Sequence, residues 1–129
     1  MSAQIIRGKR ILVVEDESII AGLLTDMLMA DGHQVDAVNT GRAALERLAD
    51  QSYDLIVSDL RMPVLDGQGL YRQLQATRPE LLRRILFVTG SALDPDNDEF
   101  LATTGVQWLA KPFSMGDLHR LTQKVLAGG

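Results

Sequence analysis

Short apolar runs alternate along the chain with longer segments in which apolar residues recur every three or four positions. Three strongly apolar runs occupy residues 11–14, 55–58 and 85–88. Such runs are typical of strands that are buried on both faces of a sheet. Two weaker runs occupy residues 34–38 and 106–110. They are expected to be strands at the edges of the same sheet.

The segments between and after these runs have the apolar spacing of helices, so the chain is predicted to alternate five strands with five helices. The fourth helix is expected to end at Thr104 and to have Asp94 as its N-cap. This alternation predicts the α/β class, with a five-stranded parallel sheet covered by helices on both faces. Three strongly apolar central strands and two less apolar edge strands fit the doubly wound order 2-1-3-4-5.

The length of 129 residues suits one domain, with a core over about residues 9–126 and loose ends at residues 1–8 and 127–129. Ligands of doubly wound sheets bind beyond the carboxyl ends of the strands, where the strand order reverses between strands 1 and 3. The residues that directly follow the central strands are therefore the first candidates for a functional site.

Charged and polar residues follow four of the predicted strands. They are Glu15 and Asp16 after the first strand, Asp59 after the third, Thr89 after the fourth and Lys111 after the fifth. Three carboxylates in one pocket repel each other, and the lysine supplies only one positive charge. An all-oxygen site of this kind suits a hard divalent cation, and Mg²⁺ is the expected one.

Four motifs in this order resemble the receiver domain of two-component response regulators. They are Glu15-Asp16, the run Asp59-x-x-Met62-Pro63-x-x-Asp66-Gly67, Thr89, and Lys111-Pro112-Phe113. The resemblance covers about residues 9–126 and implies the CheY-like, flavodoxin-like (βα)5 fold in a single receiver domain. It implies a signalling module switched by phosphorylation. Such a module is not a metabolic enzyme and catalyses only its own phosphorylation and dephosphorylation.

The resemblance also implies which residues carry the chemistry. Asp59 would be the phosphoacceptor, which takes a phosphoryl group from a histidine kinase or a histidine phosphotransfer protein. Mg²⁺ would be held by Glu15, Asp16, Asp59 and the backbone carbonyl of Arg61. Phosphoryl transfer needs an in-line nucleophile and neutralisation of the charge on the transferred oxygens, and this set of residues can supply both.

The resemblance implies a response to phosphorylation as well. Thr89 and Lys111 would contact the phosphoryl oxygens, and the peptide bond between Lys111 and Pro112 would be cis. The switch aromatic of the family, three residues before the lysine, is Trp108 here instead of the usual Tyr or Phe. Capture of the phosphoryl group by Thr89 is expected to change the burial of Trp108. The face formed by residues 95–126 would then bind a partner or form a homodimer.

Two alternatives stay open at this point. A small Mg²⁺ phosphatase of the haloacid dehalogenase type also uses a strand-end aspartate, but it needs a second acid two residues later, where this chain has Arg61. The other alternative is a degenerate receiver that acts only as a docking module, and the intact acidic set argues against it. Arg61 and Ser91 occupy positions that modulate water access to the phosphoryl group in the family, so the lifetime of the modified form is not predicted.

Composition and charge exclude several other functional classes of protein. The net charge of −4 argues against a large basic surface for nucleic acid. No apolar run approaches the length of a membrane span and no signal peptide is recognisable, so a cytoplasmic location is expected. The chain has no cysteine, which excludes disulfides and thiol catalysis. The two histidines, His33 and His119, are predicted to lie at the surface without a role.

Overall fold

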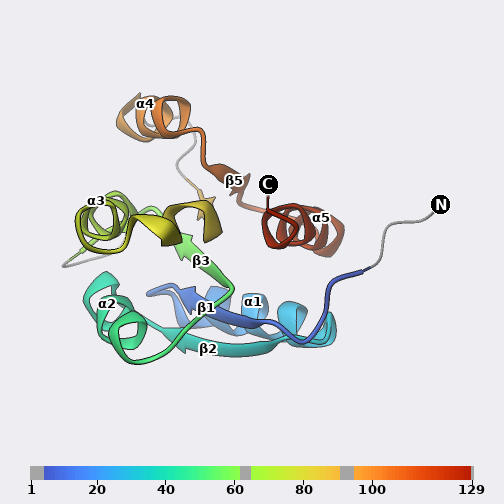
Figure 1. Ribbon diagram of the computed structural model, residues 1–129. Coiled ribbons are helices and arrows are strands. Elements are labelled where there is room, and N and C mark those ends of the chain that lie inside the picture. Colours follow the sequence, from blue (N-terminus) through green and yellow to red (C-terminus); the bar gives the residue numbers. More distant parts are fainter. Residues whose placement is uncertain (1–4, 62–64, 91–94, 129) are drawn as a thin grey trace.

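The computed structural model describes residues 5–61, 65–90 and 95–128 and shows a parallel sheet with helices on both faces (Figure 1). Its elements are β1 (Arg10–Val14), α1 (Ser18–Ala30), β2 (Gln34–Val38), α2 (Gly41–Asp50), β3 (Leu55–Asp59), α3 (Gly67–Thr77), the 3₁₀ helix η1 (Pro79–Arg84), β4 (Ile85–Thr89), α4 (Pro95–Thr104), β5 (Gln107–Ala110) and α5 (Met115–Leu126). The strand order is β2-β1-β3-β4-β5, which confirms the predicted doubly wound topology.

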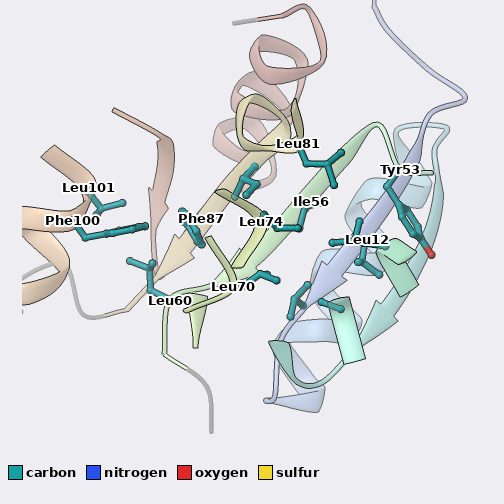
Figure 2. Packing of buried hydrophobic residues seen from close by; sticks show 14 residues of the cluster. Leu12, Tyr53, Ile56, Leu60, Leu70, Leu74, Leu81, Phe87, Phe100 and Leu101 are labelled. Carbon is teal, nitrogen blue, oxygen red and sulfur yellow. The ribbon is translucent and has the colours of Figure 1, made fainter. Parts of the chain in front are cut away.

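Two apolar cores lie on opposite faces of the sheet. One core packs β1, β3 and β4 against α2, α3, η1 and α4, and the other packs the same strands against α1 and α5 (Figure 1). In the first core, Phe100 of α4 contacts Phe87 of β4 and Tyr71 of α3 edge to face, with ring centroids 5.6 and 5.2 Å apart. Figure 2 shows Phe100 and Leu101 pointing from α4 towards Phe87 and Leu60. These contacts fix α4 on the sheet.

The predicted elements are found with small shifts at their ends. Asp59 and Thr89 are the last residues of β3 and β4, one residue further than the predicted strand ends. The third helix ends at Thr77, before Pro79 as expected, but the chain then forms η1, which the apolar pattern did not predict. The expected cap residue Asp94 lies outside the described residues.

The prediction that His33 lies at the surface is wrong. Its side chain is only 5% exposed because Gly32, with φ of +91°, turns the chain back under the N-terminal segment. The backbone N–H of Lys9 donates to His33 Nδ1 over 3.3 Å, so the proton of the neutral ring is on Nε2. Nε2 has no hydrogen-bond partner among the described residues.

The described part of the N-terminal segment, which was expected to be loose, forms hydrogen bonds with the rest of the domain. Ile6 exchanges two hydrogen bonds with the side-chain amide of Gln123 in α5, over 2.7 and 2.9 Å. The N–H of Gly8 donates to the carbonyl of Gly32 over 2.9 Å. His119 is half-exposed and lies 2.9 Å from Asp31. These contacts join the start of the chain, the α1–β2 turn and α5 at the end of the sheet away from the strand carboxyl ends.

The buried ring of His33 predicts a loss of stability in mild acid. Burial lowers the pKa of His33, and its charged form cannot accept the Lys9 hydrogen bond. The unfolded chain therefore binds a proton more readily, so the stabilisation by neutral His33 is complete above about pH 6.5 and is lost as pH falls through the folded pKa.

Urea unfolding gives the free energy of unfolding of the wild type and of His33→Asn at about pH 7.5 and about pH 5. The asparagine keeps an acceptor near the Nδ1 position but does not titrate. The wild type is expected to lose more stability on acidification than the variant does. Equal losses in the two proteins would show that His33 does not carry the acid sensitivity.

Candidate functional site

The carboxyl ends of the strands bring the predicted site residues together. β1 pairs with β3 in parallel, with Val14 opposite Ser58, so the next residues along each strand, Glu15 and Asp59, lie side by side. β4 pairs with β5, with Thr89 opposite Ala110, which places Lys111 just beyond the end of the sheet. The peptide bond between Lys111 and Pro112 is cis, as predicted.

Lys111 connects the two buried carboxylates of this pocket. Its Nζ donates to Glu15 Oε1 over 2.9 Å and to Asp59 Oδ2 over 3.2 Å. Glu15 and Asp59 are only 2% and 6% exposed. The second oxygen of each carboxylate accepts a backbone N–H over 3.2 Å, from Glu17 to Glu15 and from Arg61 to Asp59. Both carboxylates are therefore held at defined positions.

The ammonium group of Lys111 does not fully compensate the negative charge of the buried carboxylates. Burial raises the pKa of Glu15 to about 7, although the hydrogen bond from Lys111 acts in the opposite direction. Burial alone would lower the pKa of Lys111, but the hydrogen bond to Glu15 and the charge of Asp59 outweigh this and raise it. The raised pKa of Glu15 means that its charged form is poorly stabilised in the pocket. A further cation beside Glu15 would stabilise that charged form.

The carboxylates of this pocket are close enough to share a metal ion. Ligand oxygens of Glu15, Glu17 and Asp59 all lie within 4.8 Å of one another. Carboxylate oxygens are the donors that hard cations such as Mg²⁺ prefer, so the donor set fits the expected ion. The predicted ligand Asp16 is exposed and is not in this group. Its role as a ligand, like that of the Arg61 carbonyl, stays a prediction.

Glu17 is the pocket residue that the sequence analysis missed. The N–H of Glu17 donates to Glu15 Oε2 over 3.2 Å, so the backbone of Glu17 lies against the carboxylate of Glu15. The backbone of Glu17 is extended, with φ of −83° and ψ of 110°. The signal in the sequence is that Glu17 continues the acidic run that directly follows the first apolar strand.

The two predicted switch residues lie on adjacent strands. Thr89 is fully buried, and its carbonyl accepts the backbone N–H of Lys111 over 2.9 Å. Trp108 lies on the edge strand β5, opposite Phe87 of β4, and is 40% exposed. Its predicted edge position is confirmed, and its role in switching stays a prediction. The motif residues 62–63 and residue 91 lie outside the described residues.

Comparison with known proteins settles the family. The model of the response regulator receiver domain matches residues 11–123 of the chain. The chain belongs to this family. It is a receiver domain of the kind found in two-component systems, with the fold that was expected. Membership in the family favours the receiver over the haloacid dehalogenase alternative.

The relatives of this receiver domain differ in how much of their length the chain covers. The chain is 36% identical to the response regulator receiver protein CpdR of Brucella abortus, over 92% of this chain and 97% of that protein. It is 32% identical to the transcriptional regulatory protein ZraR of Escherichia coli K12, of which it spans only 26%. Receiver domains therefore occur both as nearly the whole protein and as a part of longer regulators.

A solved structure gives a close spatial match. The receiver domain of sensor histidine kinase PA1611 from Pseudomonas aeruginosa PAO1 is 34% identical, with a TM-score of 0.83 over 93% of this chain and 98% of that one. That structure is described as having a magnesium ion coordinated in its active-site cleft. Separately, none of the helices in the described part of this chain is long and apolar enough to span a bilayer.

Proposed function

We propose that Asp59 is the phosphoacceptor of this receiver domain and that its donor is a phosphohistidine on a histidine kinase or a histidine phosphotransfer protein. The observation that carries the proposal is the buried contact of Lys111 with both Asp59 and Glu15 at the carboxyl end of the sheet. A nucleophilic carboxylate, a fixed cation beside it and a second buried acid are the groups that phosphoryl transfer to an aspartate requires.

In the proposed reaction, an oxygen of Asp59 attacks phosphorus as the bond to the donor imidazole breaks, and the imidazole nitrogen keeps the electron pair. The N–H of Arg61 and the ammonium of Lys111 orient the carboxylate through its two oxygens. Lys111 can follow the developing negative charge on the transferred group. Bound Mg²⁺ would neutralise further charge on the phosphoryl oxygens, and Glu15, Asp16, Asp59 and the Arg61 carbonyl would hold it.

Replacement of the acceptor tests this proposal. Asp59→Asn is expected to abolish phosphorylation by acetyl phosphate with Mg²⁺, because the amide is not a nucleophile of comparable strength. Asp54→Asn is the matched control, since Asp54 lies next to the other end of β3 and accepts the N–H of Arg10, a bond that an asparagine oxygen can also accept. Incorporation of labelled phosphate measures both. Labelling of Asp59→Asn at the wild-type rate would refute the assignment.

A protein donor is supported by apolar side chains exposed near the pocket. Ile19 and Leu23 of α1 are 83% and 42% exposed, and Met115 at the start of α5 is 53% exposed. α1 begins directly after Glu17, and α5 begins shortly after Lys111, so these side chains flank the segments that form the pocket. Apolar side chains around a polar site are typical of a surface that docks another protein.

Ile19→Glu is expected to slow phosphotransfer from a phosphorylated histidine protein at least about tenfold, because it puts a charge into the docking surface. Phosphorylation by acetyl phosphate should be unchanged. Met29→Glu is the control, since Met29 is 56% exposed at the other end of α1. If Ile19→Glu and Met29→Glu behave alike with the protein donor, this part of α1 is not the docking surface.

We further propose that the modified state is reported through Thr89 and Trp108 to the face of residues 95–126. Thr89 ends β4 beside the pocket, and Trp108 lies one strand further out, where its half-exposed ring can change its burial. The altered face of α4, β5 and α5 would then bind a downstream partner or a second copy of the chain. On this account the domain acts as a switch and performs no turnover beyond its own phosphorylation and dephosphorylation.

A further inference from the structure

Glu17 occupies an unusual position at the mouth of the pocket. It is the N-cap residue of α1, yet its side chain makes no capping hydrogen bond. Its Oε1 instead lies 3.9 Å from Lys111 Nζ, and its side chain is 66% exposed. We propose that Glu17 is an affinity-determining residue for the divalent cation of this site. The inference rests on the proposed function and assigns a further residue to the same site.

The local geometry explains why Glu17 can act in this way. Its own N–H donates to Glu15 Oε2 over 3.2 Å, which fixes the backbone of Glu17 against the buried carboxylate. The side-chain oxygen of Glu17 then lies near the same ammonium group that contacts Glu15 and Asp59. The three oxygens of Glu15, Glu17 and Asp59 come within 4.8 Å of one another, whereas Asp16 is outside this group.

The excess of negative charge in the pocket explains how Glu17 would raise the affinity for a divalent cation. Lys111 contacts three carboxylates at once, those of Glu15, Asp59 and Glu17. One ammonium does not neutralise three carboxylates, so a divalent cation between them relieves repulsion from every member of the group. One carboxylate a few ångströms from a divalent ion contributes about tenfold to its affinity even with solvent screening. Because Glu17 is exposed, it has this effect without a large cost of burial.

Binding of Mn²⁺, followed by the loss of the electron paramagnetic resonance signal of the free ion, tests the inference without any phosphorylation. Glu17→Gln, which keeps the shape and removes the charge, is expected to weaken Mn²⁺ binding by about five- to tenfold. Glu17→Asp restores the charge on a shorter side chain and is expected to recover part of the loss. Asp26→Asn removes an exposed carboxylate elsewhere on α1 and is expected to bind like the wild type.

An affinity of Glu17→Gln within twofold of the wild type would overturn the inference, and so would an equal loss in Asp26→Asn, which would indicate a general charge effect. Phosphorylation of the wild type by acetyl phosphate separates this outcome from failure of the proposed function. If Asp59 is labelled while Glu17→Gln binds Mn²⁺ normally, only the role of Glu17 fails. If the wild type neither binds Mn²⁺ nor becomes labelled, the proposed function itself fails.

Discussion

Replacing Lys111 with methionine is expected to slow phosphorylation of Asp59 by acetyl phosphate at least about a hundredfold. Methionine keeps an unbranched apolar stem but removes the ammonium that contacts Asp59 Oδ2 and Glu15 Oε1. The cation nearest to the attacking oxygen is then missing where negative charge builds up in the transition state. The rate of incorporation of labelled phosphate at saturating Mg²⁺ measures the effect.

Lys111→Arg separates charge from shape at this position. It keeps the positive charge, but its planar guanidinium does not match a compact ammonium in a side chain that is only 16% exposed, so an intermediate rate is expected. Circular dichroism should show that both variants are folded. A Lys111→Met protein that is labelled as fast as the wild type would show that Lys111 has no part in the transfer.

Gly67→Ala is expected to destabilise the fold by about 2–3 kcal/mol, because the new methyl group has no room. A Cβ at Gly67 would lie 2.5 Å from the carbonyl oxygen of Asp59 and 2.8 Å from Leu60 Cα. The N–H of Gly67 donates to the carbonyl of Leu60 over 3.0 Å, so the start of α3 lies directly against the end of β3. Any movement that relieves the clash also displaces the backbone that carries Asp59.

Gly22→Ala provides the matched control for this prediction. Gly22 is in α1, and a Cβ there meets nothing within 4 Å, so alanine is expected to stabilise the fold by about 0.5–1 kcal/mol through its helix propensity. Urea unfolding of both variants measures the two opposite effects. A Gly67→Ala protein as stable as the wild type would mean that α3 does not need this close approach to β3.

Most of the fold could be predicted because the pattern of apolar residues follows directly from burial. The runs at 11–14, 55–58 and 85–88 are apolar on both sides, and the structure places them in the centre of the sheet with the weaker strands at its edges. The strand order then determines which loops meet. The sequence alone therefore assigns Glu15, Asp59 and Lys111 to one pocket.

The features that were missed depend on backbone direction and on the packing of single side chains. Glu17 enters the pocket because its N–H bonds to the carboxylate of Glu15, a local backbone contact that the apolar pattern does not reveal. His33 is buried because the N-terminal segment folds over it, although an isolated histidine beside a glycine is typical of a surface turn. The helix η1 forms between α3 and β4 in a stretch with no clear apolar period.

The central claim is that Asp59 accepts the phosphoryl group, and the most direct test is the mass of the intact protein after incubation with acetyl phosphate and Mg²⁺. A gain of one phosphoryl group is expected, which borohydride reduction and peptide mapping should place at Asp59, as expected for an acyl phosphate. An unchanged mass, or a phosphoryl group on a serine, a threonine or another carboxylate, would contradict the account.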